Sequence, residues 1–140
     1  HAAVFNHYAS VDIAIAAAAV ADFKPIASAN QKIKKQSGSP EIHLTSTVDI
    51  LAQMGKEKQQ QFLVGFALET ENELENAKAK CLRKNLDAIV LNSLNDKDAG
   101  FGGSHNKITY IRKDDTFVDF DLKPKTAVSK DIFTQILNAL

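Results

Sequence analysis

The sequence predicts an α/β domain built on a mainly parallel sheet, with an antiparallel hairpin towards its carboxyl end. Three short apolar runs, at residues 11–19, 61–67 and 87–92, have the length and composition of strands buried in a parallel sheet. Segments with the helical spacing of apolar residues lie between the later runs. Strand and helix patterns that alternate in this way are typical of a Rossmann-like, three-layer α/β sandwich.

The first predicted strand, residues 11–19, is an unbroken apolar run that we expect to be buried on both faces. It leads into Asp22, and Pro25 ends regular structure shortly afterwards. Residues 24–40 then combine Pro, Ser, Asn and Gly with four lysines. This composition is typical of a mobile surface segment rather than of packed core.

Residues 41–45 alternate as a short strand, and we expect Thr47 to cap a helix that runs to about Lys58. Its inward-facing residues are Ile50, Leu51 and Met54. The strand at 61–67 follows. Gly65 within that strand indicates the close approach of another group.

Thr70 and Glu73 have the spacing of a capping box and predict a helix from this point to about Lys84. The core side of that helix comprises Leu74, Ala77, Cys81 and Leu82. The strand at 87–92 ends in Asn92, a candidate site residue because it closes the strand on the expected ligand side.

Two alternating segments, at residues 106–112 and 116–122, predict an antiparallel hairpin. The glycines of the polar loop at 93–105 lack the strand-glycine-helix order of a phosphate cradle. Residues 126–140 carry one apolar stripe, which predicts a last helix covering a face of the sheet.

Composition excludes several classes of function. The 140 residues are the size of one domain, and 17 acidic residues balance 17 basic ones, so no overall field favours nucleic acid or an anionic membrane. No apolar run is long enough to span a bilayer and no leader is visible, so we expect a cytoplasmic protein. The single cysteine and the scattered histidines give no metal motif.

The end of the first apolar run is the best candidate for a nucleotide site. Ligands of open α/β sheets bind outside the carboxyl ends of the strands. Alanines at 16–19 leave the backbone open to a flat ring, Asp22 can accept hydrogen bonds from ribose hydroxyls, and the lysines that follow can meet phosphates. A tightly packed buried segment followed by a solvated lysine loop explains the same residues.

Two helical segments offer further contacts. A helix beginning near Val48, Asp49 and Ile50 has free backbone amides that suit a phosphate, although Asp49 would repel an anion. Lys80 and Lys84 lie four residues apart and therefore on one helix face, an arrangement that usually does no more than contact solvent.

The order of these motifs resembles a known family. Ala18-Ala19-Val20-Ala21-Asp22-Phe23-Lys24-Pro25 followed by Lys32-Ile33-Lys34-Lys35 is similar to the signature of phosphopantothenate–cysteine ligase, an enzyme of coenzyme A biosynthesis. Two later blocks match that family as well: Val64-Gly65-Phe66-Ala67-Leu68-Glu69-Thr70 and Lys80-Cys81-Leu82-Arg83-Lys84-Asn85-Leu86-Asp87. The resemblance covers nearly the whole chain, and it implies one ligase domain over residues 1–140 that lacks the family's glycine-rich N-terminal segment.

The resemblance also implies an activity. CTP would activate the carboxylate of 4'-phosphopantothenate as an acyl-cytidylate, and cysteine would then displace CMP. It implies Mg²⁺ bound with CTP, no flavin in this chain, a homodimer, and a flavin-dependent decarboxylase that is fused or separate. Neither nucleic acid nor a membrane is an expected partner.

The same resemblance assigns roles to individual residues. Lys32 would be the catalytic lysine, Asp22 would bind ribose, and Phe66 would pack near the nucleotide. The full set of implied nucleotide-binding residues is Ala18, Ala19, Asp22, Lys32, Val48, Asp49, Ile50, Leu51, Phe66, Lys80 and Lys84.

Three alternatives remain open at this point. The chain can be a nucleotide-binding module without catalysis, or a non-enzymatic domain that uses the edge of its hairpin. A dinucleotide-binding Rossmann domain is disfavoured because no Gly-x-Gly-x-x-Gly follows a strand. The residues do not discriminate between CTP and ATP.

Overall fold

The structure, a computed structural model, describes residues 1–34, 41–93 and 103–140. Lys35 and most of the predicted loop at 93–105 lie outside the described residues. The chain forms two compact units, of which the first comprises His1–Ala17 and Ile50–Leu140 and the second comprises Ala18–Asp49. In the described part of the chain, no helix has the length and apolar character needed to cross a membrane.

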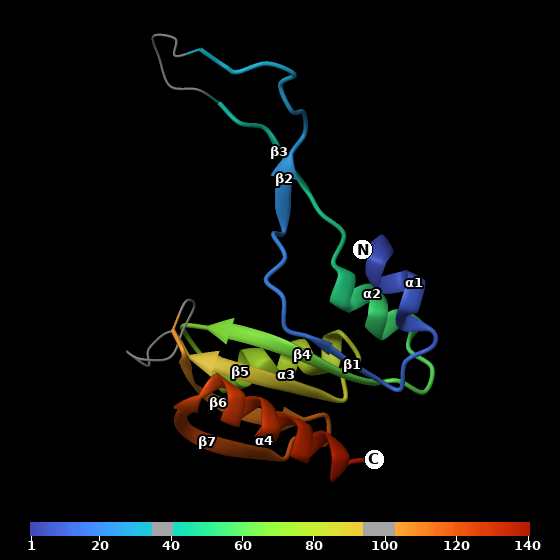
Figure 1. Ribbon diagram of the computed structural model, residues 1–140, viewed down its shortest axis with the longest axis vertical. Helices are drawn as coiled ribbons and strands as arrows, with labels where there is room; N and C mark the ends of the chain where they lie inside the picture. The colour runs from blue at the N-terminus through green and yellow to red at the C-terminus, as the bar shows by residue number, and fades with distance from the viewer. Residues whose placement is uncertain (35–40, 94–102) are drawn as a thin grey trace. The chain divides into compact units, whose positions relative to one another are not determined.

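The first unit is built on a five-stranded sheet with the strand order β1-β4-β5-β6-β7 (Figure 1). Its strands are β1 (Ile13–Ala16), β4 (Phe62–Glu69), β5 (Ala88–Ser93), β6 (His105–Arg112) and β7 (Phe117–Pro124). Its helices are α1 (Ala2–Tyr8), α2 (Ile50–Glu57), α3 (Glu73–Arg83) and α4 (Lys125–Leu137). Strands β1, β4 and β5 are parallel, whereas β6 and β7 form the predicted antiparallel hairpin. The predicted α/β fold class is therefore confirmed.

Alternation along the strands creates a separate core on each face of the sheet. In β4, Leu63 belongs to the core beneath α1, α2 and α3, while Val64 belongs to the core beneath α4. The first core comprises Tyr8, Met54, Leu63, Ala67, Ala77, Cys81, Leu86, Ile89, Leu91 and Ile111. The second comprises Val64, Ala88, Val90, Ile108, Tyr110, Val128, Ile132 and Ile136. Helices on both sides of one sheet make the three layers.

One carboxylate joins several elements at the amino end of the parallel strands. Asp87, immediately before β5, accepts hydrogen bonds from the Lys58 ammonium at 2.8 and 2.9 Å and from the Leu63 amide at 2.8 Å. Its backbone oxygen accepts a hydrogen bond from the Lys113 amide at 2.9 Å. The segment after α2, the start of β4 and the turn after β6 are thereby held at one point.

The second unit contains two short strands, β2 (Phe23–Pro25) and β3 (Leu44–Ser46), paired antiparallel. Hydrogen bonds extend this pairing: the Thr47 amide donates to Asp22 O at 2.8 Å and the Thr47 hydroxyl donates to Ala21 O at 2.6 Å. The large apolar side chains of this unit are exposed: Val20, Phe23, Ile26, Ile33, Ile42, Leu44 and Val48.

One strand prediction needs correction, and one is confirmed. Residues 11–19 do not form one strand buried on both faces, because β1 covers only Ile13–Ala16 and lies at an edge of the described sheet, where Ile15 is 43% exposed. The prediction that regular structure ends at Pro25 is confirmed, because Pro25 is the last residue of β2, where it pairs with Leu44. Proline is compatible with such a short edge strand.

Both predicted N-terminal helix caps are wrong. Thr47 does not cap α2, which begins three residues later, because its hydroxyl is used by Ala21 O in the second unit. Thr70 does not open α3 either. That helix begins at Glu73 after Asn72, whose φ of 44° places it in the left-handed region. The inward positions of Met54, Ala77 and Cys81 are confirmed, whereas Leu82 is exposed.

We expect Gly55→Ala to destabilise the first unit more than Gly65→Ala does. A Cβ at position 55 would overlap the carbonyl oxygen of Lys84, so two backbone segments must separate. A Cβ at position 65 would meet side-chain methyls of Leu86 at 2.7 Å and Leu51 at 2.9 Å, which can rotate. Urea denaturation should give a loss of roughly 2–4 kcal/mol for Gly55→Ala and about 1–2 kcal/mol for Gly65→Ala. Equal losses would contradict the distinction between backbone and side-chain contacts.

Candidate functional site

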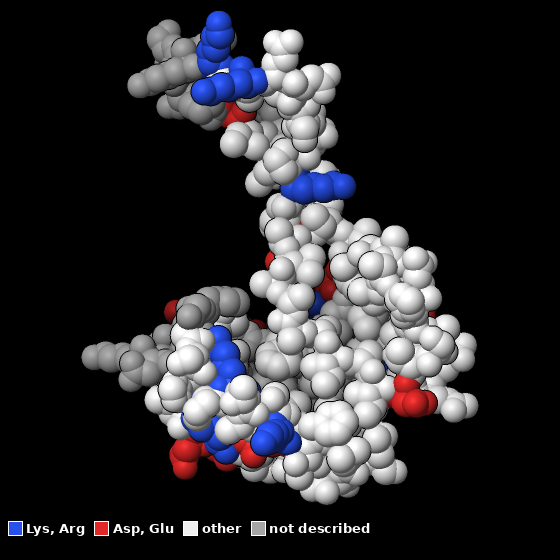
Figure 2. Space-filling view, viewed as in Figure 1, with Lys and Arg blue, Asp and Glu red and all other residues white. Residues whose placement is uncertain are grey.

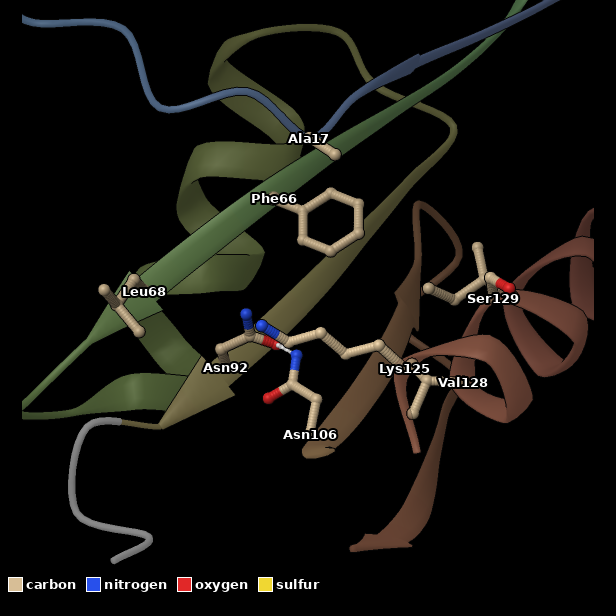
Figure 3. Close-up of a pocket in the computed structure, with 9 residues that line it drawn as sticks. Ala17, Phe66, Leu68, Asn92, Asn106, Lys125, Val128 and Ser129 are labelled. Atoms are coloured by element: carbon tan, nitrogen blue, oxygen red, sulfur yellow. Dashed lines mark hydrogen bonds between the residues drawn. The ribbon is translucent and has the colours of Figure 1, made fainter. Parts of the chain in front are cut away.

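The first unit contains a pocket of about 320 Å³ on the α4 side of the sheet (Figure 3). Strands β4 and β5 contribute residues near their carboxyl ends, β6 contributes one residue, and α4 covers the other side. The residues that line the pocket are Ala17, Phe66, Leu68, Asn92, Asn106, Lys125, Val128, Ser129 and Ile132. This is the position at which open α/β sheets bind ligands.

The chemistry of the pocket differs between its walls and its polar end. Phe66 and Leu68 of β4 and Val128 and Ile132 of α4 give apolar walls. The polar groups are two amides, one ammonium and one hydroxyl, and none of the lining residues is acidic. A small number of hydrogen-bonding groups in an otherwise apolar pocket is typical of a site for an organic ligand.

The two amides form a hydrogen-bonded pair. Asn106 Nδ2 donates to Asn92 Oδ1 at 3.1 Å, and the Lys107 backbone amide donates to Asn106 Oδ1 at 3.1 Å. Asn106 is only 8% exposed. Figure 3 shows this pair at one end of the pocket, with the Lys125 side chain extending towards it.

Sequence reasoning found part of this pocket. It singled out Phe66 and Asn92 but missed Asn106, Lys125 and Ser129. One signal was available for Asn106, because it shares the alternating pattern of Ile108 and Tyr110 and is therefore a polar residue at a core-facing position of the hairpin. Lys125 and Ser129 gave no signal, since they belong to a helix face that the sequence does not distinguish from a solvated one.

Six of the predicted nucleotide-binding residues lie in the second unit: Ala18, Ala19, Asp22, Lys32, Val48 and Asp49. All six are exposed. The described lysines of this unit are Lys24, Lys32 and Lys34, and Figure 2 shows lysine side chains on its surface. Asp22 lies directly before β2 and is joined to Thr47 through the backbone.

The other five lie in the first unit, on more than one face of its sheet. Ile50 and Leu51 begin α2 and pack against the core beneath α1, α2 and α3. Phe66 lines the pocket on the opposite face. Lys80 is in the last turn of α3, and Lys84 is the residue that ends that helix. The first unit thus brings Phe66 together with Asn92, and it places α3 with its two lysines on the other side of the sheet. The nucleotide-binding role of all eleven residues stays a prediction.

The environment of Cys81 does not favour a nucleophile. Burial, followed by the negative charge of Asp87, raises the pKa of the Cys81 thiol to about 11, and the side chain is 1% exposed. Within residues 1–34, 41–93 and 103–140, no group of three or more His, Cys, Asp or Glu side chains is arranged to hold a metal ion.

Fold and pocket together define a Rossmann-like α/β domain with a ligand-sized pocket at the carboxyl ends of its parallel strands. Residues 1–140 match the family described as the DNA/pantothenate metabolism flavoprotein C-terminal domain, and the chain belongs to that family.

Curated relatives carry two different names. One is "Cysteine/Cysteine sulfinic acid decarboxylase" from an unknown prokaryotic organism, 54% identical over 127 residues, covering 90% of this chain and 35% of that protein. Another is "Coenzyme A biosynthesis bifunctional protein CoaBC" from Bacillus subtilis, 42% identical over 134 residues, covering 96% of this chain and 33% of that protein. The chain therefore spans about a third of the length of these relatives.

Solved structures agree with the fold. The crystal structure of the C-terminal domain of CoaBC aligns with a TM-score of 0.75 and 37% identity, covering 96% of this chain and 58% of that chain. The DNA/pantothenate metabolism flavoprotein from Streptococcus pneumoniae aligns with a TM-score of 0.76 at 16% identity, which supports the fold alone.

These comparisons correct the recognition made from the motifs. Identification of the chain specifically as the phosphopantothenate–cysteine ligase domain is wrong, because the comparisons show the family and include a relative named as a decarboxylase. The matching family is the broader flavoprotein C-terminal domain, and it matches from residue 1 to residue 140. A relative with 54% identity bears the name of a decarboxylase, so the shared motifs do not single out a ligase.

The raised pKa of Cys81 predicts a loss of stability in alkali. The thiol has a pKa of 9.0 when it is accessible and about 11 in the folded protein, so the folded state keeps a proton that the unfolded chain releases. The free energy of unfolding should therefore fall as the pH rises from 9 towards 11. Urea denaturation between pH 8 and 10 should show a shallower fall for Cys81→Ala than for the wild-type protein. An unchanged slope would exclude the thiol as the cause.

Proposed function

We propose that this domain takes part in coenzyme A biosynthesis as a nucleotide-dependent ligase of the phosphopantothenate–cysteine type. The observation that carries the proposal is the pocket beside Phe66 and Asn92 at the carboxyl ends of β4 and β5. It occurs in a chain that is 42% identical, over 96% of its length, to a protein named for coenzyme A biosynthesis. A flat base fits against an aromatic ring in such an apolar pocket.

The proposed reaction has two steps. A carboxylate oxygen of 4'-phosphopantothenate attacks the α-phosphorus of CTP, and the bond to the bridging oxygen of the β-phosphate breaks, so pyrophosphate leaves. The amine of cysteine then attacks the acyl carbon, loses a proton and displaces CMP. The protein must align two anions and stabilise the charge of the leaving group.

The proposal assigns a different role in this reaction to each group of residues. In the proposal Asp22 accepts hydrogen bonds from ribose, Ala18 and Ala19 leave their backbone open to the nucleotide, and Lys32 stabilises the triphosphate as pyrophosphate leaves. Residues 48–51 would offer backbone amides. Lys80 and Lys84 lie on the other side of the sheet from the pocket, so in the proposal they add only long-range positive charge. In the proposal Mg²⁺ would bind together with the triphosphate and would neutralise part of its charge.

The proposal includes the partners that the motifs implied. These are CTP, 4'-phosphopantothenate and cysteine, a second copy of the chain in a homodimer, and a flavin-dependent decarboxylase in the same polypeptide or separate from it. The proposal also includes the cytoplasmic location that the composition predicted.

A second candidate is a domain of a cysteine or cysteine sulfinic acid decarboxylase, favoured by the 54% identity to a protein of that name. The two candidates differ in what they consume and release. We expect the protein, supplied with phosphopantothenate, cysteine and CTP, to release pyrophosphate and form an amide. Release of CO₂ from cysteine without CTP, and with no pyrophosphate, would favour the decarboxylase instead.

Asp22→Asn should weaken nucleotide binding without unfolding the protein. The amide keeps the size of the carboxylate but loses a charge-assisted hydrogen bond, so the Kd for CTP should rise roughly tenfold to a hundredfold. Calorimetric titration with CTP measures this change, and thermal melting provides the control. A collapsed melting transition with intact affinity in the folded fraction would make Asp22 a structural residue.

Lys32→Gln should block the first step while leaving the second intact. The proposal assigns contact with the departing pyrophosphate to Lys32 alone, so release of pyrophosphate should nearly stop while preformed acyl-cytidylate still reacts with cysteine. Lys34→Gln is the matched control, because this described neighbour contributes only a general field that salt screens within about 10 Å. Single-turnover assays of both half-reactions compare the variants. Equal, small effects would remove Lys32 from the mechanism.

A further inference from the structure

The orientation of the Asn106 amide is fixed by a backbone donor. The Lys107 N–H lies 3.1 Å from the Asn106 side chain, and because a backbone amide can only donate, the atom that faces it must be the amide oxygen. Asn106 Nδ2 then points the other way, to an atom of Asn92 at 3.1 Å. Since Nδ2 is a donor, that atom must be Asn92 Oδ1.

The local fold of β6 holds this arrangement in place. Asn106 lies on the same face of β6 as the buried Ile108 and Tyr110, so the alternation of the strand directs its amide inwards. Asn106 is 8% exposed while Lys107 is exposed. A buried amide that rotated by 180° would lose both hydrogen bonds, so the orientation is strongly favoured.

The consequence appears at Asn92. Its oxygen is used by Asn106, so the group that remains for the pocket is Nδ2, with two N–H donors. In the described part of the chain this nitrogen makes no hydrogen bond with another residue. Figure 3 shows the Asn92 side chain between the Asn106 amide and the Phe66 ring. A flat ligand against Phe66 therefore meets a donor, and none of the lining residues offers a carboxylate in its place.

We propose that Asn106 is a positioning residue that sets the base selectivity of this pocket by holding Asn92 with its N–H groups towards the ligand. The pocket then accepts a nucleobase with an unprotonated ring nitrogen on its pairing edge, as in cytosine or adenine. It disfavours the matched base that carries N–H at that position, as in uracil or hypoxanthine. This inference rests on the proposed use of a nucleoside triphosphate.

Two variants of Asn106 test the orientation. In Asn106→Asp one oxygen still accepts the Lys107 N–H, but the other cannot donate, so Asn92 turns its N–H groups to the new carboxylate and its oxygen to the ligand. The affinity ratios CTP to UTP and ATP to ITP should each fall about tenfold or more. Asn106→Leu releases Asn92 without adding charge, so both ratios should move towards one. If the aspartate variant does not fold, the leucine variant carries the test.

The affinity ratios separate the effect of the Asn92 amide orientation from the effect of added charge. An added negative charge repels all four triphosphates alike and cancels in each ratio. Asn138→Asp, the same chemical change at the exposed residue that ends α4, is the matched control and should leave both ratios unchanged.

Equilibrium titration of the full chain with the four triphosphates separates the outcomes. No binding by the wild-type protein would overturn the proposed function and this inference with it. Binding without preference, or ratios in Asn106→Asp equal to those of the wild type, would overturn the inference alone. Ratios that fall in Asn106→Asp and stay constant in Asn138→Asp support it.

Discussion

The carboxylate of Asp87 fixes the frame from which the pocket is built. It accepts hydrogen bonds from the ammonium of Lys58, whose side chain is 10% exposed, and from an amide at the start of β4. The backbone oxygen of Asp87 accepts a hydrogen bond from the turn after β6. Removing one partner of such a poorly solvated ion pair leaves the other charge unpaired, which is energetically costly. Substitution of Asp87 therefore disturbs three segments together. Because β4 and β5 start from this common point, Phe66 and Asn92 reach the opposite end of the sheet in a fixed register. Rigid elements position a site more accurately than loops do.

The strands and the last helix were predictable because burial imposes a period on the sequence. Leu63 and Val64 face different cores, and Val128, Ile132 and Ile136 follow one helix face. The helix starts were not predictable in the same way. The Thr47 hydroxyl donates to a residue 26 positions earlier in the chain, and no local pattern anticipates that partner. The pairing of Phe23–Pro25 with Leu44–Ser46 also depends on residues far apart in sequence.

The residues of the pocket also divide into those that the sequence predicts and those that it does not. Phe66 and Asn92 follow from the rule that ligands bind at the carboxyl ends of parallel strands. Asn106 lies on an antiparallel strand, and its role depends on its hydrogen bonds with Asn92 and with the Lys107 amide. Family membership adds the fold but not the chemistry, since relatives of this domain carry the names of a coenzyme A biosynthesis protein and of a decarboxylase. The particular side chains around the pocket must decide between them.

The second unit has a thermodynamic consequence of its own. Its described regular structure is one pair of three-residue strands, and its large apolar side chains are exposed. A two-stranded ribbon without a covered apolar face is marginally stable in water. The first unit, with a core on each face of its sheet, has far more burial to lose on unfolding. The chain therefore has two stabilities, and a single melting temperature reports the first unit while local opening near β2 and β3 proceeds unseen.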